Sequence, residues 1–289
     1  MLLSFYKSCL AGSILWLGLL GRPAFAAAGD WVGDNRVAAR LITATTGAGT
    51  AGTVDAGVEF RVAPGWHVYW RSPGDAGLPP SVDWTGSINL ATATVAWPFP
   101  TRLIVDGLQN NIYPGAVVLP VTVALSHATD AVQLQAHLAY AACGEVCVPY
   151  LADLALHLPA GTSLPAPEAA IIAEARVKVP GALSTLGINL DELSVHQGVG
   201  APFLAITLRN DKEAFVAPNL FVESESGGWN IPTAELWSHH HVAKFHVALP
   251  AGVTNADGVC LTFVNNGHAA SFRANAALKA QRLQRQSTC

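Results

Sequence analysis

The sequence predicts an all-β protein in which two β-sandwich domains are joined by a short proline-rich and helical linker. Three observations predict this fold class. The chain holds 26 glycines and 18 prolines, it is rich in threonine and valine, and short runs of alternating apolar and polar residues recur along it. Such runs, separated by turn residues, are typical of strands that bury one face. The length of 289 residues is sufficient for two domains of ordinary size.

Residues 1–26 have the features of a secretory signal peptide. Lys7 gives a short positive start, Ser8–Leu20 is an apolar segment of 13 residues, and Ala24–Ala26 places small residues at a cleavage site. That segment is too short to span a bilayer, and no later apolar run approaches the necessary length. We therefore expect cleavage, export to the periplasm, no later membrane insertion, and an oxidising compartment that permits disulfides.

The first predicted domain covers residues 29–159. Its expected strands follow the two-residue period of a half-buried strand. A turn-rich stretch, Ser72–Pro80, follows the third strand, and residues 98–114 are expected to form a long loop. Long loops inside compact domains are often functional, so this loop is a candidate cover for a reactive group. The expected strands are Arg36–Thr43, Thr53–Val62, Trp66–Trp70, Ile88–Trp97, Val117–Leu125, Val132–Tyr140 and Val148–Leu158.

Residues 160–185 form the predicted linker. Small residues and prolines fill its first part, and Ala169–Val177 is expected to be a short helix. The second predicted domain covers residues 186–277, and residues 278–289 form a polar, basic tail. Cys260 is predicted to be a buried core thiol, because it lies in an apolar run. Pairing of Cys289 with Cys260 or with another molecule is an open alternative that no pattern favours. The expected strands of this domain are Ala205–Leu208, Asn219–Glu223, Lys244–Leu249 and Cys260–Asn265.

Cys143 and Cys147 are the two cysteines close enough in sequence to act as a local pair. A straight strand separates Cα atoms four residues apart by about 13 Å, whereas a disulfide requires about 4.4 to 6.8 Å. The sulfurs can therefore bond only if the chain reverses between them, and Gly144 gives the flexibility for that reversal. A bridge across so short a loop stabilises the fold by only roughly 2 kcal/mol. Close bridges of this kind are readily reduced, which favours thiol exchange.

Two other interpretations of the pair stay open. Small local disulfides also serve as permanent staples in exported proteins. Metal binding by the pair is the less favoured alternative, since a closed zinc site requires four ligands and no second cysteine pair completes one. The sequence does not decide which of the two sulfurs attacks a partner.

A run of histidines in the second domain suggests a further hypothesis. His239 and His241 share a face if their segment is extended, and imidazoles placed in this way could bind copper or another transition metal. A histidine-rich surface strand or loop is the alternative, because no spacing fixes a closed ligand set. A non-catalytic binding module with a permanent bridge is thus the second functional hypothesis.

Composition and motifs argue against several classes of function. Charged residues make up 12% of the chain and the formal net charge is -4, so no basic stripe for nucleic acid is expected. A glycine-rich phosphate loop, a nucleophile elbow and a paired zinc motif are all missing from the sequence. We expect no cofactor.

Four stretches of the first domain carry a family resemblance. They are Cys143–Pro149, Gly65–Gly77, Trp97–Pro98 and Val118–Val121. Together they resemble the N-terminal periplasmic domain of the DsbD/ScsB family of transmembrane thiol:disulfide reductases, and the resemblance is strongest to its ScsB-like branch. Residues 218–223 look like the second domain that members of this branch carry, so most of the mature chain is included. The resemblance implies an immunoglobulin-like sandwich.

The resemblance also implies a site and an activity. It makes Cys143 and Cys147 the exchanging pair of a thiol-disulfide oxidoreductase of the protein-disulfide reductase type, which passes electrons to thioredoxin-like periplasmic proteins. It makes Val105–Tyr113 a cap that shields the pair, and it places His67 and Tyr69 near the two sulfurs. The cap residues that it implies are Asp106, Gly107, Leu108 and Tyr113.

The sequence departs from the family in one respect. The transmembrane electron-supplying domain and the thioredoxin-like domain of the family have no counterpart in it. We therefore expect either that the electrons come from a separate protein, such as a transmembrane thiol reductase, or that the chain has kept the fold for another use.

Overall fold

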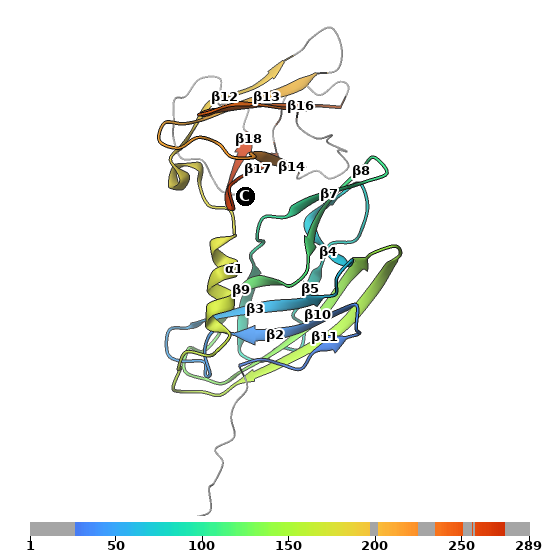
Figure 1. Cartoon of the computed structure of the whole chain (residues 1–289). Coiled ribbons are helices and arrows are strands. Elements are labelled where there is room, and N and C mark those ends of the chain that lie inside the picture. Colours follow the sequence, from blue (N-terminus) through green and yellow to red (C-terminus); the bar gives the residue numbers. More distant parts are fainter. Residues whose placement is uncertain (1–26, 197–201, 225–234, 251–255, 257, 275–289) are drawn as a thin grey trace, which may run out of the picture.

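The computed structural model describes residues 27–196, 202–224, 235–250, 256 and 258–274. The predicted signal peptide and the predicted tail, residues 278–289, lie outside this part of the chain. Two β-sandwiches follow one another along the sequence, with a helix beside the junction (Figure 1). All paired strands are antiparallel, so the predicted all-β, immunoglobulin-like fold class is confirmed.

The first sandwich consists of two facing sheets. One sheet contains, in spatial order, β1 (Val32–Gly33), β2 (Val37–Thr43), β3 (Thr53–Val62), β9 (Val117–Leu125) and β6 (Leu90–Val95). The other contains β11 (Cys147–Leu158), β10 (Val132–Cys143), β4 (His67–Gly74), β8 (Leu108–Pro114) and β7 (Thr101–Val105), and β5 (Ser81–Asp83) pairs with β10. All these strands lie within residues 29–159.

Strands β10 and β11 form a long hairpin because their side chains alternate between core and solvent. On β11, Ala152, Leu154 and Leu156 are buried, while the residues between them are exposed. The ladder pairs the two strands continuously from Val132–Leu158 to Cys143–Cys147. The hairpin therefore turns at the two cysteines.

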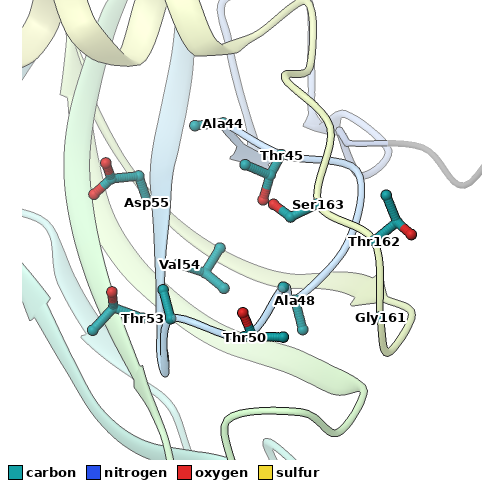
Figure 2. Close-up of a pocket in the computed structure, with 12 residues that line it drawn as sticks. Ala44, Thr45, Ala48, Thr50, Thr53, Val54, Asp55, Gly161, Thr162 and Ser163 are labelled. Atoms are coloured by element: carbon teal, nitrogen blue, oxygen red, sulfur yellow. The ribbon is translucent and has the colours of Figure 1, made fainter.

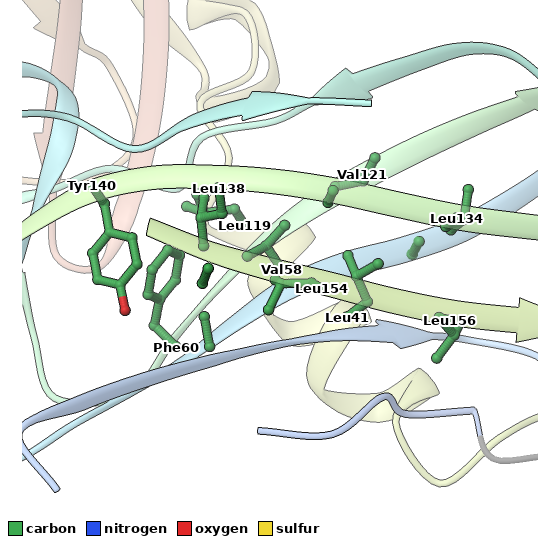
Figure 3. Close-up of a cluster of buried hydrophobic side chains, with 14 of the residues drawn as sticks. Leu41, Val58, Phe60, Leu119, Val121, Leu134, Leu138, Tyr140, Leu154 and Leu156 are labelled. Atoms are coloured by element: carbon green, nitrogen blue, oxygen red, sulfur yellow. The ribbon is translucent and has the colours of Figure 1, made fainter. Parts of the chain in front are cut away.

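Large apolar side chains fill the space between the two sheets (Figure 3). Phe60 of β3 and Tyr140 of β10 are fully buried, and their rings meet edge to face with centroids 5.2 Å apart. Trp70 of β4 is fully buried as well. Burial of several aromatic and aliphatic side chains of this size is the main stabilising contribution to such a domain.

Residues 98–114 differ from the predicted long loop. Strands β7 and β8 form a hairpin in which Val105 pairs with Leu108. The two turn residues, Asp106 and Gly107, have positive φ angles of 51° and 81°, as a two-residue type I′ turn requires. Asp-Gly between two strands is the usual signal for this turn, but prolines and asparagines around it favoured a loop prediction.

The linker and the second sandwich complete the described fold. Helix α1 (Ala169–Val177) has the predicted limits and is followed by the short 3-10 helix η1 (Leu183–Leu186). Ile172 of α1 packs on Val118 of the first sandwich. Within the described residues, no helix combines the length and apolar character needed to cross a membrane. The second sandwich has one sheet of β12 (Ile188–His196), β13 (Phe203–Asn210), β16 (Val242–Ala248) and β15 (Glu235–His239), and one of β14 (Asn219–Ser224), β17 (Val259–Asn265) and β18 (His268–Ala274).

Cys260 of β17 is buried, with 5% of its surface exposed, as the apolar run around it predicts. Its sulfur is disulfide-bonded, however, which corrects the prediction of a core thiol. Burial alone does not distinguish a thiol from a disulfide, since both are accommodated in an apolar core.

Candidate redox site

The first sandwich carries a disulfide at the end of its longest hairpin. Cys143 is the last residue of β10, Cys147 is the first residue of β11, and their Cα atoms are 4.1 Å apart. The Gly144 N–H donates a hydrogen bond of 3.0 Å to the Val146 carbonyl and closes the turn between them. The chain thus reverses between the two cysteines as their spacing requires.

The two sulfurs have different surroundings. Cys143 is 2% exposed and packs with Tyr69, Ile112 and Ala141. Cys147 is an exposed residue, and Val146 beside it is 62% exposed. Since thiol exchange requires direct approach to a sulfur atom, Cys147 is the side of the bridge that another protein can reach.

Strand β4 lines the bridge on its buried side. Cys143 pairs with His67 across the ladder, so the alternation of side chains puts His67 and Tyr69 on the face that holds the disulfide. The Tyr69 hydroxyl lies 3.9 Å from Cys147 Sγ, and His67 Nε2 lies 3.4 Å from the same hydroxyl. The structure therefore brings both predicted neighbours to the cysteine pair.

Burial sets the protonation of these neighbours. It raises the pKa of the Tyr69 hydroxyl and lowers the pKa of the His67 imidazole. At neutral pH, Tyr69 is then a neutral hydrogen-bond donor and His67 is uncharged. The turn itself contains neither lysine nor arginine, so the Tyr69 hydroxyl is the group placed to stabilise a thiolate on Cys147.

Residues 74–78, which we call the strap, cross over Tyr69. Gly77 has a φ of +95°, and a Cβ atom at this position would collide with three atoms of the Tyr69 ring. The Asp75 N–H donates to the Gln109 carbonyl at 2.8 Å, and the Gln109 N–H donates to Asp75 Oδ2 at 2.7 Å. The strap is thus tied to β8 and covers the Tyr69 ring, whose hydroxyl lies 3.9 Å from Cys147 Sγ. The turn residues of Ser72–Pro80 predict only an irregular stretch and not a cover over Tyr69. Glycine and proline content alone does not show what such a stretch covers.

The predicted cap residues are divided between two places. Asp106 and Gly107 form the turn of the β7–β8 hairpin, and Leu108 beside them is 49% exposed. This turn is a projection separate from the β10–β11 turn (Figure 1). The hairpin reaches the disulfide through its stem, because Leu103 and Ile112 pack in the cluster around Cys143.

Tyr113 lies on the opposite face of the sheet. It pairs with Val68 rather than with His67 or Tyr69, and it belongs to the main core with 5% of its surface exposed. Its hydroxyl donates a hydrogen bond of 2.6 Å to the Pro98 carbonyl. Burial raises the pKa of this hydroxyl well above its usual value.

The histidine run occupies a turn. Strand β15 ends at His239 and β16 begins at Val242, with these two residues paired. His239 Nδ1 and His240 Nδ1 are 3.0 Å apart, whereas His241 Nδ1 lies 2.8 Å from the Asn210 carbonyl. His239 and His241 therefore meet different partners instead of sharing the face of an extended segment. In the described part of the chain, no group of three or more His, Cys, Asp or Glu side chains is placed to hold a metal ion.

A cavity of about 700 Å³ lies at the other end of the first sandwich. It is lined by residues of the segment between β2 and β3, by the first three residues of β3, and by residues 161–163 after β11 (Figure 2). Leu158 precedes the lining residues 161–163 in the sequence. It pairs with Val132 at the end of the β10–β11 ladder that is remote from the cysteines. The cavity is therefore separate from the disulfide.

Comparisons with known proteins give two matches. Residues 38–159 match the sequence model of the family described as thiol:disulfide interchange protein DsbD, N-terminal. The crystal structure of the N-terminal periplasmic domain of ScsB from Proteus mirabilis superposes with a TM-score of 0.65 and 22% sequence identity, and the match covers 85% of this chain and 96% of that chain. This structural likeness shows a shared fold. No curated protein sequence matches the chain.

Proposed function

We propose that this chain is a periplasmic thiol:disulfide interchange protein, because residues 38–159 match the model of the DsbD N-terminal family. Its Cys143–Cys147 pair passes electrons to or from thioredoxin-like partner proteins. The observation that carries this function is the asymmetry of the bridge, with Cys143 buried at 2% exposure and Cys147 exposed at the end of a hairpin.

The exchange proceeds through Cys147. When the pair is oxidised, a partner thiolate attacks Cys147 Sγ, the bond to Cys143 breaks, and Cys143 leaves as a thiolate that takes up a proton. The partner's second thiol then attacks the partner sulfur that is bonded to Cys147. This forms a disulfide within the partner and releases Cys147 as a thiolate. Two electrons have moved from the partner to this chain, and no cofactor is required. In the opposite direction, the Cys147 thiolate attacks a partner disulfide and Cys143 resolves the intermediate.

The β7–β8 hairpin is the proposed cap of the pair. Leu103 and Ile112 on its stem already contact the Cys143 cluster, so movement of the hairpin changes the cover over the buried sulfur. Asp106, Gly107 and Leu108 form its exposed end. Tyr113 anchors the hairpin in the core through its bond to Pro98.

Export through residues 1–26 and a separate transmembrane thiol reductase as the electron source are further parts of the proposed function. The signal peptide lies outside the described residues. Support for the compartment comes from the similar Proteus mirabilis structure, which is of a periplasmic domain.

Redox titration of the purified mature chain tests the function. In mixtures of reduced and oxidised dithiothreitol or glutathione, we expect the Cys143–Cys147 pair to open and close reversibly as a two-electron couple. The disulfide of Cys260, a residue with 5% of its surface exposed, is titrated in the same mixtures for comparison. A pair that stays oxidised at high concentrations of reductant would instead identify a permanent staple and a binding module.

Replacement of Tyr69 by phenylalanine tests the role of its hydroxyl. Donation by this hydroxyl favours the thiolate form of reduced Cys147, so its loss is expected to lower the thiolate fraction at neutral pH. We expect alkylation of the reduced protein by iodoacetamide at pH 7 to slow about three- to tenfold, as the loss of one hydrogen bond predicts. Tyr150→Phe is the control, because its hydroxyl donates to Asp34 Oδ2 at 3.0 Å and not to a sulfur. Equal rates in the wild type and Tyr69→Phe would contradict this role.

A further inference from the structure

Strand β14 of the second sandwich buries residues in two different cores. Leu220 belongs to the core of the second sandwich, whereas Phe221, the next residue, belongs to the core cluster of the first sandwich and is 2% exposed. Neighbouring side chains on a strand point to opposite faces. The two sandwiches are therefore joined by a strand that is buried on both sides.

Phe221 meets the two strands that border the redox site. Its ring packs edge to face on Trp70 of β4, with centroids 5.8 Å apart. The Arg102 guanidinium of β7 lies 4.9 Å from the centroid of the same ring, and its Nη2 donates a hydrogen bond of 2.6 Å to the Leu220 carbonyl. Aromatic and cation contacts of this kind add to the stabilisation from apolar burial.

An ion pair fixes the same interface. Arg71 of β4 donates from Nε and Nη2 to the two carboxylate oxygens of Glu223, and both distances are 2.8 Å. The two side chains are 26% and 15% exposed, so salt screens the pair less than it screens a surface pair. A bidentate ion pair also fixes the orientation of the Arg71 side chain, and it thereby restrains the part of β4 that carries this residue.

These contacts fall on an irregular part of β4. The pairing of β4 with β8 is interrupted between Tyr69 and Gly74, and Trp70 and Arg71 lie in the interrupted segment. Tyr69 directly precedes the segment, and the strap over its ring follows it. Irregular strand segments next to functional sites redirect the side chains beside them, and here Phe221 and Glu223 of the second sandwich contact the irregular segment.

We propose that Phe221 and Glu223 are positioning residues for thiol exchange, an inference that rests on the function proposed above. By holding Trp70 and Arg71, they keep the Tyr69 hydroxyl beside Cys147 and keep the strap over the Tyr69 ring. The second sandwich thereby acts in the redox reaction through β4.

Variants of the full mature chain test this inference. Glu223→Gln removes the charge of the carboxylate with little change in shape. Phe221→Leu removes the ring that packs on Trp70 and leaves an apolar side chain in its place. For both we expect alkylation of reduced Cys147 at pH 7 to slow roughly three- to tenfold, in the same direction as for Tyr69→Phe. Glu223→Gln added to Tyr69→Phe is expected to cause no further slowing, because both changes remove the same hydroxyl from Cys147.

Two controls match the substitutions. Glu59→Gln breaks a comparable pair, in which Arg40 Nε donates to Glu59 Oε2 at 2.7 Å with exposures of 22% and 16%, on the other sheet. Phe245→Leu replaces a ring in the core of the second sandwich, where Phe245 is 1% exposed. Both controls should alkylate at the wild-type rate. Wild-type rates for Glu223→Gln and Phe221→Leu, or full additivity with Tyr69→Phe, would overturn the inference. Failure of wild-type Cys143–Cys147 to be reduced would instead overturn the proposed function.

Discussion

The Cys143→Ser variant is expected to accumulate a mixed disulfide with a thioredoxin-like protein, and the Cys147→Ser variant is expected to accumulate none. In Cys143→Ser, the exposed Cys147 thiolate can still attack a partner disulfide, but no second sulfur is present to resolve the product. In Cys147→Ser, the remaining sulfur is buried at 2% exposure beneath Tyr69 and Ile112. A folded partner cannot reach it.

The measurement is trapping in periplasmic extracts, followed by non-reducing electrophoresis and identification of the captured protein. The double variant Cys143→Ser/Cys147→Ser is the control for capture through other cysteines, since it leaves Cys260 and Cys289 unchanged. Equal trapping by the two single variants would show that burial does not select the attacking sulfur. Absence of trapping by either variant would argue against a relay.

The second large effect is expected at the strap. Gly77→Ala places a Cβ atom against the Tyr69 ring at a backbone φ of +95°. The positive φ alone costs about 1 to 2 kcal/mol for a residue with a side chain, and forced displacement of packed atoms costs about 1 to 3 kcal/mol more. We expect the free energy of unfolding to fall by roughly 2 to 5 kcal/mol.

Gly161→Ala separates these two contributions. Gly161 has a φ of +90°, and a Cβ atom there would meet nothing within 4 Å, so only the backbone cost of about 1 to 2 kcal/mol applies. Urea unfolding followed by tryptophan fluorescence measures both variants. Equal losses of stability at the two positions would show that the strap does not press on Tyr69.

The sequence predicts those parts of the fold that depend on neighbours along the chain. The alternation on both sides of the cysteines predicts the β10–β11 hairpin, and the need for the chain to reverse predicts its turn. Helix α1 follows the expected limits. Strand β12 was not predicted, because acidic residues interrupt the alternation of its apolar and polar side chains. The pairing of this strand with β13 also shifts register between Leu190 and Glu192.

Features of the candidate site that depend on contacts between distant segments could not be predicted from the sequence. Cys143 is buried because Tyr69 and Ile112, far away along the chain, pack on it, so the difference between the two sulfurs emerges only in the folded sheet. Phe221 follows the period of an ordinary strand residue, and nothing local indicates that it enters the other sandwich. The neighbourhood of His67 and Tyr69 came from family resemblance, because no local pattern predicts which strand lies beside β10.

The uninterrupted ladder between β10 and β11 has a consequence for the proposed exchange reaction. Twelve residue pairs, from Val132–Leu158 to Cys143–Cys147, hold the hairpin together, and only the terminal pair is covalently joined. When that bond opens, the other residue pairs still hold the two strands together. The two thiols therefore remain opposite each other and can form the disulfide again without refolding. The proposed exchange would therefore not require the hairpin to form again in each cycle, because the ladder that aligns the sulfurs does not depend on the bond between them.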